Sequence, residues 1–208
     1  MTRSRDARLA STPNLGPTQT KYEALNPILR YANHQYFATI RNLLRSVSAE
    51  SLLDAGAGEG AVLSDIGHYG IDRVVALDID PERSSLAKAS LTNTHVVIGD
   101  AHDLPFGSNS FDLVLLLEVL EHLGDPEAVV KEVQRVTKRY VLGSVPHEPW
   151  WRFGNMLRLK YWRDWGNTPE HVNHWSSRGF QALVSSRFNI LKVAHPFLWT
   201  FVLAEKVD

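Results

Sequence analysis

A glycine-rich turn between a buried strand and a helix constrains this chain more than any other feature. Residues 51–60 read SLLDAGAGEG, and the helical pattern AVLSDI follows them. Glycine lets the backbone adopt positive φ and leaves no Cβ between the chain and a flat ligand. The pattern therefore predicts a nucleotide-binding turn, with a tight strand-to-helix turn that binds nothing as the alternative.

The spacing of the glycines argues against two common phosphate-binding turns. Glycines stand at every second position, Gly56, Gly58 and Gly60. A dinucleotide-binding turn needs G-x-G-x-x-G, and a P-loop needs a Gly-Lys-Ser/Thr sequence. Two acids, Asp54 and Glu59, lie beside the glycines. Carboxylates suit a ligand with an amine or a sulfonium group better than a pyrophosphate.

Short apolar runs alternate with helical patterns along the rest of the chain. We expect five β–α units and a C-terminal antiparallel hairpin, which make a doubly wound, Rossmann-like α/β fold around a mostly parallel, seven-stranded sheet. The expected strands are 52–53 with the acid that follows, 74–78, 94–98, 111–117, 140–145, 188–194 and 197–204. The expected helices are 21–45 with a break near Pro27, two that begin at Pro81 and Pro126, and 176–186.

Length and composition suit one domain with modest insertions. We expect a mobile arm over residues 1–18, a single domain over 19–208, and a substrate-covering insertion at about 146–175. There are no cysteines, the formal net charge is -1, and no apolar run approaches the roughly 20 residues of a membrane span. The sequence thus predicts a cytoplasmic protein without disulfides, a membrane partner or a nucleic-acid partner.

The glycine turn and the phrases after it resemble those of the class I S-adenosylmethionine (SAM) methyltransferases. The acid that ends the second strand, Asp78, lies about 20 residues past the glycines, where a carboxylate can accept the hydroxyls of a ribose. The resemblance implies that SAM is the cofactor and that Asp100 and Ala101 meet its adenine. The expected cofactor-binding residues are Asp54, Gly56, Gly58, Asp78, Ile79, Asp100, Ala101 and Glu118.

Two carboxylates and an imidazole directly follow the fourth strand. Glu118, Glu121 and His122 can converge on one point if the chain is tightly coiled there. Such a set suits Mg²⁺ or another divalent cation. The alternative is a lone acid near the methyl donor followed by a polar start of a helix, and many metal-free methyltransferases carry the same phrase.

A second histidine cluster favours the metal. Together with the three residues above, His171 and its neighbours resemble the metal site of the small-RNA 2′-O-methyltransferases, which implies His171 as the fourth ligand. A divalent cation lowers the pKa of a bound hydroxyl and aligns its oxygen with the sulfonium methyl. His147 or His174 is then the expected proton acceptor, and Glu121 completes the expected catalytic set.

Five of the six tryptophans lie between His147 and Trp175, interleaved with arginines and a lysine. Flat rings and forked donors suit a carbohydrate or nucleotide acceptor, whereas the alternatives are a hydrophobic lid or a homodimer interface. The chain also resembles, more loosely, the actinobacterial glycan methyltransferases, including the mannoside 1-O-methyltransferase of methylmannose polysaccharide synthesis. The leading prediction is a metal-dependent SAM O-methyltransferase that acts on a saccharide hydroxyl.

Other functions stay open on the sequence. Methylation of RNA 3′ ends at the 2′ oxygen fits the metal phrases, but the balanced charge argues against it, because binding a phosphate backbone needs several uncompensated Lys or Arg residues. A metal-independent O-methyltransferase of a small molecule needs the same cofactor residues. A SAM-binding regulator needs the glycines and Asp78 but not the Glu/His set, and the glycine spacing disfavours a dinucleotide oxidoreductase.

Overall fold

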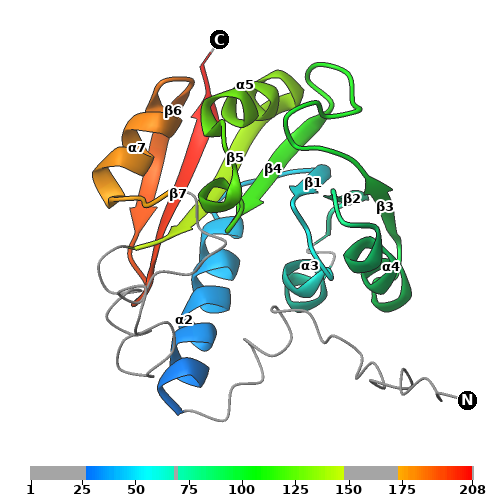
Figure 1. The fold of residues 1–208 in the computed structure, drawn as a ribbon, viewed down its shortest axis with the longest axis horizontal. Coiled ribbons are helices and arrows are strands. Elements are labelled where there is room, and N and C mark those ends of the chain that lie inside the picture. Colours follow the sequence, from blue (N-terminus) through cyan, green and yellow to red (C-terminus); the bar gives the residue numbers. More distant parts are fainter. Residues whose placement is uncertain (1–26, 68–69, 148–172, 208) are drawn as a thin grey trace, which may run out of the picture.

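The structure of this chain, a computed structural model, describes residues 27–67, 70–147 and 173–207. These residues form a seven-stranded sheet with helices on both faces (Figure 1). The strands stand in the order β3-β2-β1-β4-β5-β7-β6, and β7 runs antiparallel to both of its neighbours. The prediction of a doubly wound, mostly parallel sheet with a C-terminal antiparallel hairpin is therefore confirmed.

Each strand expected from the apolar runs is present, with its ends displaced by a few residues at most. The central strands β1 and β4 are buried almost throughout, because helices cover both faces of a parallel sheet. The strands are β1 (Ser51–Ala55), β2 (Arg73–Asp78), β3 (Thr94–Ile98), β4 (Phe111–Leu117), β5 (Thr137–Pro146), β6 (Phe188–Ala194) and β7 (Trp199–Lys206).

Two helices begin where an aspartate precedes a proline. Asp80 accepts hydrogen bonds from two N–H groups of the first turn of α4, and Asp125 accepts one from the first turn of α5. Proline fits the first helical position, because its missing N–H would have no partner inside the helix. The helices of the described residues are α2 (Pro27–Leu44), α3 (Ala61–Ile66), α4 (Pro81–Ser90), the short 3₁₀ helix η1 (Leu120–His122), α5 (Pro126–Val136) and α7 (Ser177–Ser185). None of them is long and apolar enough to cross a membrane.

The expected five β–α units are not all present. Residues 99–110, which connect β3 to β4, contain turns but no helix. Proline and glycine at positions 105 and 107 disfavour a helix there. The loop is instead fixed to α5, because Arg135 donates hydrogen bonds to the carbonyl oxygens of Leu104 and Phe106 at 2.9 and 2.7 Å.

Two hydrophobic cores lie on the two faces of the sheet. On one face, α5 and α7 bury apolar side chains that include Val129, Val133 and Phe180. On the other face, α2 and α3 cover the sheet, and Tyr36 of α2 packs on Trp199 and Phe201 of β7 with ring centroids 4.9 and 5.1 Å apart. The aromatic contact anchors α2 beside the carboxyl ends of the strands. The predicted arm and most of the predicted insertion lie outside the described residues.

Candidate functional site

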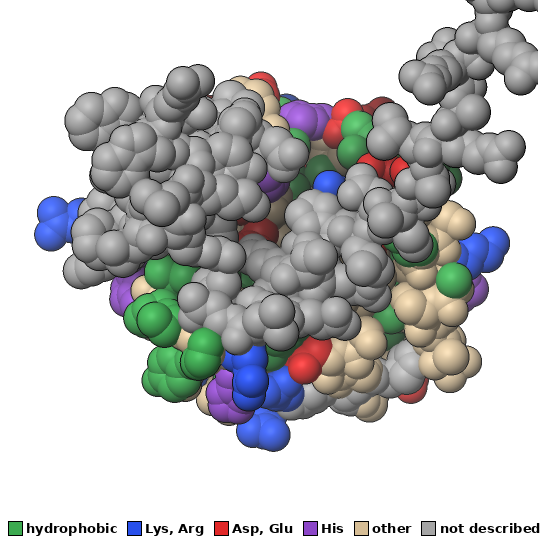
Figure 2. All heavy atoms as spheres, turned by 60° about the horizontal axis from the view of Figure 1, so that its bottom comes forward, with side chains coloured by type: hydrophobic (Ala, Val, Ile, Leu, Met, Phe, Trp, Pro, Cys, Tyr) green, Lys and Arg blue, Asp and Glu red, His purple; other side chains and the backbone are tan. Residues whose placement is uncertain are grey.

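The strand order places a ligand crevice at one point of the sheet. β1 is hydrogen-bonded to β2 on one side and to β4 on the other. The strands that follow β1 are therefore added on one side of it, through β2 to β3, and from β4 onward they are added on the opposite side. In doubly wound sheets, ligands bind beyond the carboxyl ends of the strands at this switch point. Figure 2 shows this edge of the molecule, with acidic and histidine side chains visible in a hollow.

The glycine turn passes very close to the segment that follows β4. Gly56 has φ 92°, and a Cβ added there would lie 2.4 Å from a methyl carbon of Val119. Gly58 also has positive φ, and its N–H donates a hydrogen bond of 2.7 Å to Asp78 at the end of β2. The other oxygen of Asp78 accepts from the N–H of Asp80 at 2.9 Å. Asp78 therefore fixes the turn against β2, and each oxygen can still accept a further bond.

Two buried carboxylates flank the turn. Asp54 is 2% exposed and Glu59 is 6% exposed. Among the described residues, neither Oδ2 of Asp54 nor Oε1 of Glu59 has a hydrogen-bond partner. Burial, and secondly the charge of Asp78, raises the pKa of Asp54 to about 7. The turn therefore contains carboxylate oxygens that a cationic ligand could pair with.

Three more of the predicted cofactor residues, Ile79, Asp100 and Ala101, follow β2 and β3, which are adjacent strands. Ile79 is 65% exposed, which leaves an apolar surface directly after Asp78. Asp100 accepts a bond from the backbone N–H of His102 and contacts the His102 ring nitrogen at 2.7 Å, and these two hydrogen bonds lower the pKa of the Asp100 carboxyl. Ala101 is buried beneath it. The structure thus gathers these predicted residues at one edge.

Glu118 occupies an unusual backbone conformation. Its φ is 55°, in the left-handed region that few residues other than glycine adopt. The indole N–H of Trp199 donates a hydrogen bond to the Glu118 carboxylate, and the N–H of Glu118 donates to the carbonyl of Ser144 at 3.1 Å. Strained backbone of this kind persists where surrounding contacts enforce it, and it is concentrated at functional sites.

Three of the four predicted metal ligands lie among the described residues. No group of three or more His, Asp or Glu side chains among the described residues is placed to hold a cation. The carboxylate of Glu118 is directed to Trp199, Glu121 is 2% exposed within η1, and His122 is exposed. Glu121 and His122 belong to the short helix η1, and Glu118 precedes it. The fourth predicted ligand, His171, lies outside the described residues.

One histidine at the carboxyl-end edge was missed by the sequence analysis. The rings of His147, after β5, and His195, after β6, have centroids 6.0 Å apart. A ring nitrogen of His195 is 3.4 Å from the hydroxyl of the buried Thr200. The expected antiparallel hairpin could have indicated this histidine. An antiparallel β7 between β5 and β6 brings the carboxyl ends of β5 and β6 to the same edge of the sheet. His174 is exposed.

Comparisons with known proteins find similarity to methyltransferases. Residues 53–141 match the methyltransferase domain family. A protein of Mycobacterium tuberculosis named an uncharacterized methyltransferase is 36% identical over 95 residues, which are 46% of this chain and 38% of that protein. A demethylmenaquinone methyltransferase of Paenarthrobacter aurescens is 30% identical over 138 residues, which are 64% of this chain and 54% of that protein.

Solved structures share the fold at low sequence identity. Magnesium protoporphyrin IX methyltransferase from Synechocystis, solved with bound SAH, has a TM-score of 0.69 and 16% identity, with 91% of this chain and 93% of that chain covered. A Pyrococcus horikoshii protein has a TM-score of 0.68 and 18% identity, with 90% and 95% covered. The chain spans about half or less of the length of the curated relatives quoted above. Together, the comparisons show that residues 53–141 are similar to methyltransferases and that the chain shares the fold of solved structures that include a methyltransferase with bound SAH.

Proposed function

We propose that this protein binds SAM beyond the carboxyl ends of β1 and β2 and transfers its methyl group to an acceptor near the ends of β4 and β5. The observation that carries the proposal is the pair of buried carboxylates beside the glycine turn. Asp54 and Glu59 each have an oxygen without a partner among the described residues. Buried polar groups normally have partners, so these oxygens favour a ligand that supplies donors.

The charges of SAM suit these carboxylates. SAM carries an ammonium and a sulfonium group, and a nearby cation favours the ionised form of a carboxyl. Because the pKa of Asp54 is about 7 without a ligand, binding an ammonium there is expected to release a proton near neutral pH. Asp78 would accept the ribose hydroxyls, while the exposed side chain of Ile79 offers an apolar surface to the adenine.

The acceptor side offers a proton acceptor and a fixed carboxylate. In the transfer, the sulfonium–methyl bond breaks, the acceptor–methyl bond forms and SAH leaves, so the proton of an acceptor hydroxyl must go to a base. His147 is half-buried at the end of β5 and is the imidazole that the proposal assigns to this step. Glu118, oriented by Trp199, would orient the acceptor beside the methyl group.

For the acceptor we propose the hydroxyl of a saccharide, which rests on the sequence resemblance alone. A quinone is the second candidate, because the Paenarthrobacter aurescens relative is named a demethylmenaquinone methyltransferase. No step is assigned to a metal, since no group of three or more His, Asp or Glu side chains among the described residues is placed to hold one. Turnover that continues in EDTA would support a metal-independent reaction. Turnover that EDTA abolishes would show that the reaction needs the predicted divalent cation.

Calorimetric titration with SAM and with NAD tests the cofactor. We expect SAM alone to bind, and we expect Asp78→Ala to weaken SAM at least about ten-fold through the loss of bonds to a charged acceptor. Asp72→Ala, an exposed acid at the other end of β2, is the matched control and should leave the affinity unchanged. Binding of NAD, or equal affinities in both variants, would contradict the proposal. Methyl transfer from labelled SAM to a saccharide or a quinone then identifies the acceptor.

A further inference from the structure

An exposed apolar patch lies at the N-terminal end of α2, beside the turn that joins β6 to β7. Ile28 is 62% exposed, Tyr31 57% and Phe197 51%. The rings of Tyr31 and Phe197 meet edge to face with centroids 6.3 Å apart, so the two elements form one continuous surface. Large apolar side chains exposed as a group mark an interaction surface, unlike those exposed singly.

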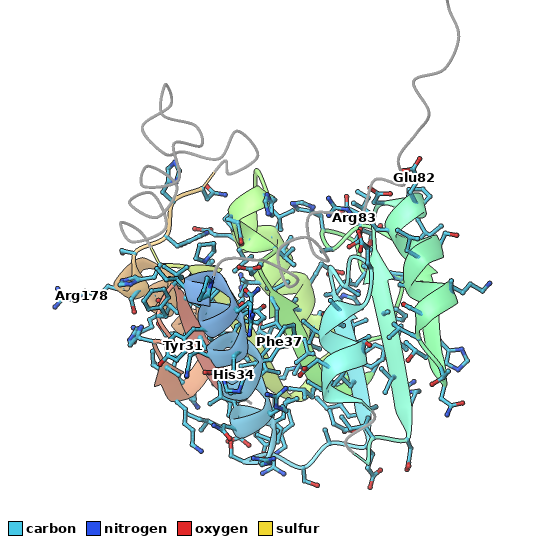
Figure 3. The ribbon with its side chains drawn as sticks, turned by 90° about the horizontal axis from the view of Figure 1, so that it is seen from below. Tyr31, His34, Phe37, Glu82, Arg83 and Arg178 are labelled. Carbon is cyan, nitrogen blue, oxygen red and sulfur yellow. The ribbon has the colours of Figure 1, made fainter. Side chains whose placement is uncertain are left out.

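Basic side chains are exposed on α2 and on β6, the strand that precedes Phe197. On α2, Arg30 and His34 are exposed, and His34 lies on the same face as Tyr31, three residues along the helix (Figure 3). On β6, the exposed Lys192 lies two residues from Ala194, so both side chains point to the face of the sheet that α2 covers. Figure 2 shows hydrophobic side chains gathered beside Lys, Arg and His at the lower left.

The two elements that carry the patch contain no acid at all. Neither α2 nor the segment from Phe188 to Ala204 has an Asp or a Glu, although the whole chain has 23 acidic residues against 22 Lys and Arg residues. Arg41 of α2 is paired with Asp65 of α3, whereas no salt bridge within the described residues involves Arg30 or Lys192. The patch therefore presents positive charge around apolar side chains on a protein of balanced charge.

We propose that Ile28, Tyr31 and Phe197, with Arg30, His34 and Lys192, form a docking surface for the anionic face of a lipid bilayer. The Tyr31 ring with its polar hydroxyl suits the interface between headgroups and acyl chains, and Phe197 and Ile28 supply apolar contacts to the acyl chains. Basic residues beside such rings are attracted to anionic lipids. Three apolar side chains and a few charges give weak, reversible binding, which is the usual behaviour of a surface of this size.

Two other partners fit the patch less well. A nucleic-acid backbone needs more positive charges than this patch carries, and the aliphatic Ile28 offers nothing to a phosphate. A second copy of the chain would need a larger buried area than three side chains supply to form a stable dimer. The sequence analysis expected no membrane partner because it searched for a continuous apolar run, and such a search cannot detect a patch assembled from two distant segments.

The patch lies at the same edge of the sheet as the candidate site. Phe197 is two residues from His195, whose ring neighbours that of His147 at the end of β5. A bilayer at the patch would therefore face the acceptor side, so that an acceptor anchored in the membrane could reach the methyl group. This consequence rests on the proposed function, whereas docking itself does not.

Co-sedimentation with vesicles tests the docking surface without any methyl transfer. The full chain is expected to bind phosphatidylcholine vesicles that contain phosphatidylserine, and to bind pure phosphatidylcholine much less. Tyr31→Ser with Phe197→Ser should lower the partition coefficient about ten-fold, since both rings would leave the interface. Arg30→Glu should lower it about five-fold or more, and raising the salt concentration should lower it further.

Leu86→Ser with Val207→Ser is the matched control, because it removes two exposed apolar side chains elsewhere on the molecule. We expect it to bind vesicles as the wild type does. No binding by the wild type, or an equal loss in the control, would overturn the proposal. So would sedimentation showing that the Tyr31 and Phe197 changes only dissociate a dimer. Unchanged SAM affinity and melting temperature in the variants would show that the fold and the cofactor site are intact.

Discussion

The cofactor half and the acceptor half of the carboxyl-end edge are built in different ways. In the cofactor half, Gly58 and Asp78 are 20 residues apart and share a hydrogen bond of 2.7 Å. In the acceptor half, Trp199 reaches Glu118 across 81 residues of sequence. The first half is a local motif closed by tight turns, whereas the second depends on β7 lying between β5 and β6. Substitutions should therefore separate the halves into one that controls SAM binding and one that controls the acceptor.

Asp54→Asn should give the largest change, in the cofactor half. The pKa of folded Asp54 is about 7, above the unfolded value of 3.8, so the folded state keeps a proton that the unfolded state has released. Its contribution to stability is therefore full below about pH 4 and is lost as the pH rises to 7. Relative to the wild type, the variant without SAM should gain about 4 kcal/mol in free energy of unfolding between pH 4 and pH 8.

Urea unfolding of both proteins at several pH values checks this difference. A variant whose stability parallels that of the wild type at every pH would show that Asp54 is not a buried, protonated acid. The same variant should bind SAM more weakly, because the amide cannot supply a negative charge to the ammonium.

Gly56→Ala should give the second largest effect. The alanine Cβ would meet Val119 at 2.4 Å, and φ 92° is strained for any residue with a Cβ. We expect a loss of about 3 kcal/mol in free energy of unfolding, together with weak SAM binding. Gly67→Ala is the control, because Gly67 also has positive φ but a Cβ there would have no neighbour within 4 Å. Equal losses in the two variants would mean that the close approach to Val119 has no importance.

Trp199→Phe should affect the acceptor half alone. The ring still fills the core beside Tyr36, but the N–H that holds the Glu118 carboxylate is lost. We expect kcat/KM for the acceptor to fall about ten-fold, since a hydrogen bond to a charged group contributes about 1.5 to 3 kcal/mol, while the SAM affinity stays the same. Trp175→Phe is the matched control and should leave kcat/KM unchanged, because the Trp175 N–H has no partner among the described residues. A drop in SAM affinity would show that the two halves are not separable here.

His102→Ala should have the smallest effect. His102 contacts Asp100 at 2.7 Å, and the two side chains are 32% and 49% exposed. Pairs in contact with solvent in this way contribute about 0 to 1 kcal/mol. The backbone N–H of His102 still bonds to Asp100, so the loop keeps its shape. Calorimetry should find a SAM affinity within about three-fold of the wild type. A larger loss of SAM affinity would show that the His102 imidazole itself takes part in binding the cofactor.

The sequence alone determined the fold and the position of the glycine turn. Apolar runs, glycine spacing and Asp-Pro helix starts are local signals, and they predicted every strand, the turn at Gly56 and Gly58, and the acids at Asp54 and Asp78. The loop from 99 to 110 was misread as part of a β–α unit, because alternation of strands by itself does not require a helix in each connection.

Only the tertiary structure decided the arrangement of the acceptor half. Within the phrase that contains Glu118, Glu121 and His122, the short helix η1 buries Glu121 and leaves His122 exposed. The partner of Glu118 is Trp199, and the neighbour of His147 is His195, because an antiparallel β7 brings distant strand ends together. Contacts of this kind depend on the order and direction of strands across the whole sheet, which no short stretch of sequence encodes.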